Sequence, residues 1–207
     1  MKYDIITIGS ATVDYFADSD SELISLDTRT SHESLIAFPL GGKILITELN
    51  TTTGGGGTNT AVSFSRLGFK TAWLGKLGND VAADFVRGKL KQENVDFIGK
   101  SEGNTGVSFI LNSIRDDRTI LTYKGANNNL LPEDMPPIQA PWVYLSSMLE
   151  KSLASVIGLV KSDDSFKLAF NHSSYQASMG YEKLKPLIDR VSILIMIREE
   201  ACKFLGR

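Results

Sequence analysis

The sequence predicts an α/β fold with a mostly parallel sheet. Short, continuously apolar segments alternate with helical patterns, as is typical of parallel strands buried on both faces. The clearest helical pattern starts at Leu149, from which apolar residues recur at i, i+4, i+7, i+8 and i+11. Two hairpin-like segments interrupt the alternation, so we expect small β insertions beside the sheet.

The composition is that of one globular domain. The 207 residues are 42% hydrophobic and 22% charged, with a net charge of −2 and no basic cluster, which disfavours nucleic-acid binding. The longest apolar run, residues 193–197, is too short to span a bilayer. The single cysteine, Cys202, fits a reducing compartment. His32 and His172 are far apart, which disfavours a His-rich metal site. We therefore expect a cytoplasmic protein that binds no membrane.

The first strand is predicted at residues 5–8, and Asp14 is expected in the loop beyond it. Ligands of open α/β sheets bind at that edge, although a turn or cap carboxylate is an equal alternative on local evidence. Residues 18–33 are polar and predict a loop with at most one helical turn. Residues 35–38 and 43–49 then predict a hairpin around the turn Gly41-Gly42.

Residues 54–57 are four consecutive glycines, and a helix is predicted from Asn59 to Leu67, ended by Gly68. Glycine adds no apolar area and loses the most backbone entropy, so packing does not explain the run. A glycine loop that opens a helix instead brings backbone N–H groups close to a polar ligand. Residues 50–53 predict a loop, which disfavours a dinucleotide-binding turn. No Gly-Lys-Ser/Thr follows the glycine run at the spacing that a Walker A loop needs, which excludes that loop here.

The later elements alternate again. Asp80 is expected in the first turn of a helix whose residues Val81, Phe85, Val86 and Leu90 share one face. Ser147 and Glu150 have the spacing of a capping box. In order, we expect a strand at 70–75, the helix after Asp80, a strand at 96–98, a hairpin of 107–111 and 119–123 with its turn at 115–118, a corner at 125–127, a strand at 142–145, the helix from Leu149, a strand at 167–170, a helix at 181–187, a strand at 192–197 and a last helix from Arg198.

The pattern Gly55-Gly56-Gly57-x-Asn59-x-Ala61, followed by Gly68 and Gly78, resembles the N-terminal signature of the ribokinase-like (pfkB) carbohydrate kinase family. Residues 9–14 resemble the first loop of that family, and residues 78–80, 105–106 and 125–127 also have counterparts. The resemblance implies a three-layer α/β/α sandwich of ribokinase type, with 1–207 forming a single, incomplete domain whose C-terminal part is missing. It also implies a β-lid of two hairpins, inserted at about 34–50 and 105–124.

The resemblance further implies an ATP-dependent kinase that phosphorylates a hydroxyl of a sugar or sugar-like substrate. ATP and Mg²⁺ are then expected for the complete enzyme, and a homodimer through the lid. The substrate-binding residues that it implies are Asp14, Gly55, Gly56, Asn59, Asn127 and Asn171. Glu200 resembles the glutamate of the N-x-x-E motif that places magnesium and phosphate.

Alternatives stay open for four side chains. Asn127 either contacts the substrate or only shapes a corner, and Glu200 either helps to place magnesium or is a first-turn helix carboxylate. Helix N-capping competes with sugar binding for Asn59. Glu150 fits either a sugar-contacting acid of some family members or the capping box.

Two departures from the family pattern limit the expected function. Ile197 replaces the asparagine of the N-x-x-E motif, and no residues match the G-x-G-D segment that carries the catalytic aspartate. We therefore expect no catalytic residue in this chain, a base beyond Arg207, and no kinase activity of the chain alone. The alternatives are a non-catalytic sugar- or nucleoside-binding module, a relic that serves only association, and an adenosine-type nucleoside kinase. An uncovered sheet edge and an uncovered apolar face are also expected, with a risk of self-association.

Overall fold

The computed structural model describes residues 2–19, 23–112 and 118–206. The chain forms two compact units. The first consists of Met1–Thr12, Thr53–Gly106 and Lys124–Arg207, and the second of Val13–Thr52 and Val107–Tyr123.

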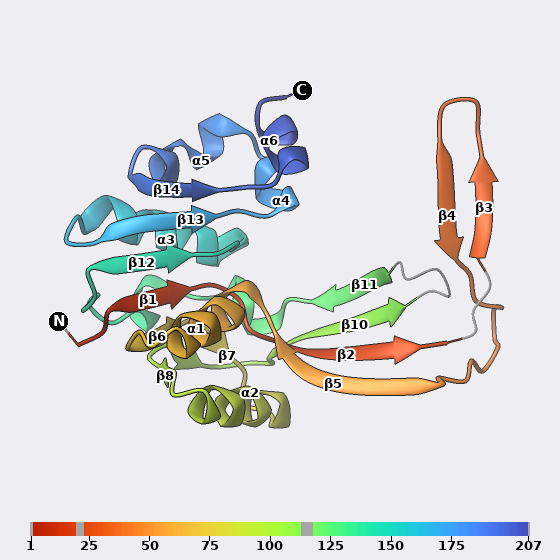
Figure 1. The fold of residues 1–207 in the computed structure, drawn as a ribbon, viewed down its shortest axis with the longest axis horizontal. Helices are drawn as coiled ribbons and strands as arrows, with labels where there is room; N and C mark the ends of the chain where they lie inside the picture. Colours follow the sequence, from red (N-terminus) through yellow and green to blue (C-terminus); the bar gives the residue numbers. More distant parts are fainter. Residues whose placement is uncertain (1, 20–22, 113–117, 207) are drawn as a thin grey trace. The chain divides into compact units, whose positions relative to one another are not determined.

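The first unit contains a six-stranded sheet in the order β14-β13-β12-β1-β6-β8 (Figure 1). All its described strand pairs are parallel. Its strands are β1 (Ile5–Ile8), β6 (Thr71–Leu74), β8 (Asp96–Phe97), β12 (Trp142–Leu145), β13 (Lys167–Asn171) and β14 (Val191–Ile195). These match the six strands predicted for the sheet, to within two residues at either end. A small parallel pair that the sequence did not predict, β7 (Lys76–Leu77) and β9 (Lys100–Ser101), lies apart from this sheet.

Helices connect these strands, as the alternating pattern predicts. They are α1 (Gly56–Arg66), α2 (Val81–Gln92), α3 (Glu150–Ser162), α4 (Ser174–Ala177), α5 (Tyr181–Ile188) and α6 (Arg198–Phe204), with the 3₁₀ turns η1 (Gly125–Asn128) and η2 (Pro132–Asp134). Both α4 and η2 are too short to show a period in the sequence and were not predicted.

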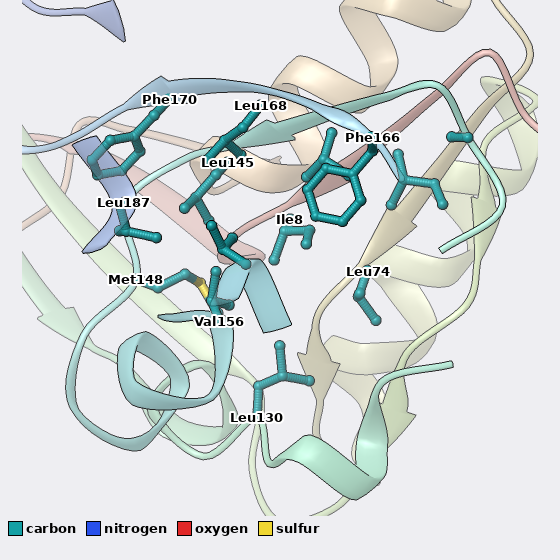
Figure 2. Packing of buried hydrophobic residues seen from close by; sticks show 14 of the residues in the cluster. Ile8, Leu74, Leu130, Leu145, Met148, Val156, Phe166, Leu168, Phe170 and Leu187 are labelled. Carbon is teal, nitrogen blue, oxygen red and sulfur yellow. The ribbon is translucent and has the colours of Figure 1, made fainter. Parts of the chain in front are cut away.

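The main hydrophobic core lies between one face of the sheet and helices α3 and α5 (Figure 2). Ile8, Leu145 and Phe170 are in register on neighbouring strands and are fully buried. Since partners in register point to the same face, they form one apolar row across the sheet. Val156 of α3 and Leu187 of α5 belong to the same cluster, and burying each such side chain contributes about 1.5–3 kcal/mol.

The opposite face is covered only in part. Helix α1 packs on β1 and β6, and Phe64 of α1 meets Tyr144 edge to face with ring centroids 5.6 Å apart. Beside α1, an apolar groove of about 460 Å³ lies over β12, β13 and β14. Ile193 and Ile195 line this groove and are 48% and 41% exposed. The expected uncovered apolar face is therefore present.

The buried face of helix α2 differs from the predicted one. Its buried residues are Ala83, Val86 and Leu90, whereas Val81 and Phe85 are exposed. Asp80 is the N-cap, one residue before the first turn, and its Oδ1 accepts a hydrogen bond of 2.8 Å from the Ala83 N–H. A capping carboxylate of this kind fixes where the first turn starts.

Asp80 also joins α2 to the chain at Thr105. The Thr105 N–H and hydroxyl donate to its two oxygens at 2.7 and 2.6 Å. Burial raises the pKa of Asp80, but the hydrogen bonds from Thr105 and Ala83 outweigh burial, so that the pKa lies below its ordinary value.

The second unit contains a sheet of its own. β2 (Thr12–Asp18), β5 (Glu48–Gly54), β10 (Gly106–Asn112) and β11 (Arg118–Tyr123) form a four-stranded sheet in the order β11-β10-β2-β5. The hairpin predicted at 107–111 and 119–123 is confirmed, with Val107 opposite Tyr123. Of its predicted turn, residues 115–117 lie outside the described part of the chain.

Three predictions for this unit are wrong. The expected loop at 18–33 contains β3 (Leu23–Asp27) and part of β4 (His32–Ile36), which pair with each other, while residues 20–22 lie outside the described part. Residues 35–38 therefore do not pair with 43–49. Residues 50–53 belong to strand β5 and are not a loop, so a strand does lead into the glycine run.

The reason for these errors is the exposure of the strands. In β3, β4 and β5 almost every side chain is exposed or only partly buried. Backbone pairing stabilises such strands, together with three β-branched threonines in β5, and strict apolar alternation is not required.

Candidate functional site

The glycine run packs against the end of β1. Gly55, the N-cap of α1, has a φ of +98°, and a Cβ there would lie 2.4 Å from the Ser10 carbonyl oxygen. A Cβ on Gly57 would lie 2.5 Å from Trp73 Nε1. The expectation that packing does not explain the run is therefore wrong for these two glycines, because their neighbours leave no space for a side chain.

The first backbone donors of α1 are used within the protein. The Ser10 carbonyl accepts hydrogen bonds from the N–H groups of Gly57, at 3.0 Å, and Thr58, at 3.4 Å. These two donors are not available to a ligand, contrary to the expectation for a glycine loop at a helix start. Gly56 differs from its neighbours because it is exposed, and a Cβ there would meet only the Ser146 side chain, with Oγ at 2.7 Å.

Asn59 lies inside α1, since the helix begins at Gly56. It is therefore not the N-cap, and the capping alternative is wrong. The helix starts earlier than predicted because its first turn is built from glycines, whose low helix propensity hid it in the sequence. The Asn59 side chain is exposed, so that its amide is accessible to a ligand.

Asp14 lies in strand β2 of the second unit and not in a loop beyond β1. The chain enters β2 only four residues after β1 ends, which leaves no long loop to hold it. Its Oδ1 is buried and has no hydrogen-bond partner among the described residues. A buried polar atom without a partner is uncommon in native proteins and is a candidate for ligand binding.

Asn127 is 3% exposed and its side chain bridges two segments of the first unit. Oδ1 accepts from the Ala11 N–H at 2.9 Å, while Nδ2 donates to the carbonyls of Ala11, at 2.8 Å, and Lys124, at 3.0 Å. This amide thus ties the η1 turn to the segment that follows β1. Its hydrogen bonds are those of a positioning residue.

Asn171 and Glu200 are both bonded to main-chain groups near β14. Asn171 Nδ2 donates to the Ile195 carbonyl at 2.9 Å. Glu200 is 8% exposed, and its Oε2 accepts from the Ile197 N–H at 3.2 Å and lies 3.9 Å from His172 Nδ1. Ile197 itself caps α6 without a side-chain hydrogen bond.

The residues near Glu200 do not fit a protein-ligated metal centre. The described residues contain no group of three or more His, Cys, Asp or Glu side chains that could hold an ion. The Glu200 carboxylate, moreover, is used by the first turn of its own helix. We therefore assign no step to magnesium.

A polar pocket of about 180 Å³ lies at the carboxyl end of the sheet in the first unit. Besides the predicted site residue Asn127, its polar lining consists of Ser10, Lys124, Asn128, Ser147, Ser173 and Tyr175. The three serines follow β1, β12 and β13, which are neighbours in the sheet. Ligands of open α/β sheets bind at this edge. None of these six residues was predicted as a site residue, although the position of a serine two residues after a buried strand could have indicated Ser10, Ser147 and Ser173.

Comparison with known proteins decides the family. Residues 5–207 match the family described as pfkB family carbohydrate kinase. The chain belongs to the pfkB family. It is 29% identical to a ribokinase of Staphylococcus aureus over 138 residues, which are 65% of this chain and 41% of the relative. The match thus spans less than half of that relative's length.

Solved structures show that this pfkB chain has the ribokinase-like fold. Adenosine kinase from Sinorhizobium meliloti superposes with a TM-score of 0.76 at 21% identity, over 99% of this chain and 68% of that one. Ribokinase from Arabidopsis thaliana, complexed with ribose and ATP, gives a TM-score of 0.75 at 19% identity, over 100% and 64%. Among the described residues of the pfkB chain, no helix is both long enough and apolar enough to cross a membrane.

Glu150 has a strained backbone in this pfkB chain. Its φ is +51°, and such a conformation in a residue other than glycine costs about 1–3 kcal/mol and clusters at functional sites. The predicted capping box is wrong, because the N-cap of α3 is Leu149 and Ser147 Oγ bonds to Ser173 Oγ at 2.7 Å.

Proposed function

We propose that the chain supplies the acceptor-binding part of an ATP-dependent pfkB kinase that phosphorylates a hydroxyl of a sugar or sugar-like molecule. One observation supports this proposal independently of family membership. The hydroxyl-rich pocket lies at the carboxyl ends of three neighbouring parallel strands, where its side chains can hold a sugar-like acceptor by hydrogen bonds.

In this proposal, Asp14 and Asn59 bind acceptor hydroxyls. A carboxylate accepts two hydrogen bonds and a carboxamide both donates and accepts, so that each can engage vicinal hydroxyls. The unpartnered Oδ1 of Asp14 and the exposure of Asn59 support these roles. Gly56 presents main chain without a Cβ to the acceptor, whereas Gly55 shapes the loop by packing on Ser10.

Asn127 and Asn171 act as positioning residues in the proposal. Their amides hold η1 and the end of β13 in place, and these segments carry Asn128 and Ser173 of the pocket. Glu150 is proposed to contact the acceptor, because its strained backbone is otherwise unexplained. Glu200 has no assigned role in binding magnesium or phosphate.

Turnover is not proposed for these 207 residues alone. In-line phosphoryl transfer needs a positioned acceptor and neutralisation of the developing charge. No G-x-G-D segment occurs in the sequence. The use of ATP is proposed from the family and from the Arabidopsis ribokinase structure with ATP.

The second unit is proposed to be the lid that excludes water from the acceptor and to form a homodimer contact. Residues 34–50 and 105–124, the expected insertions, mostly lie within it. Phe109 of β10 and Leu121 of β11 lie opposite each other on one face of this sheet and are 50% and 56% exposed, which supports an association surface there.

A non-catalytic binding module is the second candidate. It is favoured by the Glu200 carboxylate, whose Oε2 already accepts a hydrogen bond from the Ile197 N–H.

Two measurements on the purified chain test the proposal and separate the candidates. Calorimetry with ribose, fructose, adenosine and ATP should show binding of a sugar, and a coupled ADP-release assay should show no turnover. Turnover by the pure chain would contradict the assignment of a partial, acceptor-binding function. Binding of adenosine but of no sugar would identify a nucleoside kinase. Binding of a sugar with no affinity for ATP would favour the module.

A further inference from the structure

We propose that Lys124 makes the pocket a subsite for an anionic oxygen group, so that the acceptor is a sugar acid or a phosphorylated sugar and not a neutral sugar. This inference rests on the proposed function and narrows it to a class of substrate.

Lys124 brings the only full charge to the described lining of the pocket. The other polar lining residues are serines, asparagines and a tyrosine, and no carboxylate belongs to the lining. Lys124 also makes no ion pair with a described residue, in contrast to the buried Lys76, which pairs with Asp134 at 2.8 Å. A lysine in a concave site with no carboxylate partner attracts an anion.

The hydroxyl groups complete an anion-binding environment. Ser147 Oγ and Ser173 Oγ are 2.7 Å apart and share one hydrogen bond, in which one hydroxyl is the donor. The hydroxyl that accepts this bond keeps its own proton free for a ligand. Lys124 and the serines together therefore offer donors to a carboxylate or a phosphate, and such charge-assisted bonds are roughly twice as strong as neutral ones.

The structure also indicates a clean substitution. Asn127 binds the Lys124 residue only through its main-chain carbonyl, by Nδ2 at 3.0 Å and by its N–H at 3.1 Å. Lys124→Met keeps this carbonyl and an unbranched stem of similar length, and removes only the ammonium group. Lys151→Met is the matched control, because Lys151 is an exposed lysine of α3 outside the pocket lining.

The test is calorimetry of the full chain and both variants with ribose, gluconate, ribose 5-phosphate, inorganic phosphate and ATP. We expect gluconate or ribose 5-phosphate to bind at least about tenfold more tightly than ribose. Loss of a hydrogen bond to a charged group corresponds to about 10- to 100-fold in Kd, so Lys124→Met should weaken the anionic sugar by this factor and ribose by less than about threefold. Lys151→Met should change neither.

Two kinds of result would overturn the anionic subsite without affecting the proposed function. Ribose binding that equals or exceeds that of the anionic sugars, or anionic binding unaffected by Lys124→Met, removes the subsite but leaves a sugar-binding chain. If Lys124→Met loses affinity for inorganic phosphate and ATP but keeps its affinity for the anionic sugars, Lys124 binds the phosphoryl donor and not the sugar that accepts the phosphoryl group. If no sugar binds, neutral or anionic, the proposed function itself fails. Equal melting temperatures of the variants by circular dichroism show that the fold is retained.

Discussion

Replacing Gly55 by alanine tests whether the glycine run is set by packing. With a φ of +98° and a ψ of 137°, Gly55 lies outside the left-handed helical region, and this conformation costs a residue with a Cβ about 1–3 kcal/mol. The Cβ would also lie 2.4 Å from the Ser10 carbonyl oxygen and 2.7 Å from the Ala11 Cα, both main-chain atoms that cannot rotate away. Such overpacking typically costs about 1–3 kcal/mol, so Gly55→Ala should lower the free energy of unfolding by about 2–6 kcal/mol.

Urea denaturation followed by tryptophan fluorescence measures this loss. Both tryptophans, Trp73 and Trp142, lie in the first unit and report on the sheet against which the loop packs. Gly88→Ala in α2 is the matched control, because it has no atom within 4 Å of an added Cβ and no positive φ. The control should be unchanged or gain about 0.5–1 kcal/mol from helix propensity.

The difference between Gly55→Ala and Gly88→Ala shows whether close packing requires a glycine at position 55. If Gly55→Ala stays within about 0.5 kcal/mol of the wild type, as neutral surface substitutions do, the close packing on Ser10 is not a constraint. The role of this glycine would then have to lie in ligand contact alone.

Three further predictions concern stability and association. Asn127→Ala should lower the free energy of unfolding by about 2–4 kcal/mol in the same urea assay, because it leaves the buried main-chain groups of Ala11 unpaired; a loss below about 1 kcal/mol would refute the bridging role. Because the pKa of Asp80 is lower in the folded chain than in the unfolded chain, its stabilising contribution is present above the unfolded pKa, about 4, and is lost as the pH falls through the folded value. Asp80→Asn should thus flatten the acid side of the stability profile, and an unchanged acid slope would contradict this. The chain should form oligomers in light scattering, and Ile195→Lys in the exposed groove should reduce them; a monodisperse monomer would argue against association through this face.

The parallel sheet could be predicted from the sequence because its strands are short, continuously apolar segments. Ile5–Ile8 and Trp142–Leu145 are short apolar segments between loops, a pattern typical of strands that are covered on both faces. The hairpin at Val107 and Tyr123 was likewise visible, since two β-rich segments flank a polar turn. Strands β3 and β4 are exposed, and their pairing left no apolar pattern to read.

The candidate site could be predicted only in part. Glycine spacing identified the family, but it could not show that Gly55 and Gly57 lie against Ser10 and Trp73, since both contacts join segments far apart in the sequence. The polar pocket was missed for the same reason. Lys124 and Ser173 lie 49 residues apart in the sequence and meet only through the parallel order of the strands.

The most direct test of the account is the binding of an acceptor to this chain. Calorimetry with neutral and anionic sugars should give saturable binding of at least one of them, and Asn59→Ala should weaken it about tenfold or more, the usual effect of losing one or two hydrogen bonds. Ser63→Ala serves as a control on the same helix, because the Ser63 hydroxyl bonds only to the Asn59 carbonyl. If no sugar produces a binding isotherm, or if Asn59→Ala binds as tightly as the wild type, the acceptor-binding role assigned to this chain is contradicted.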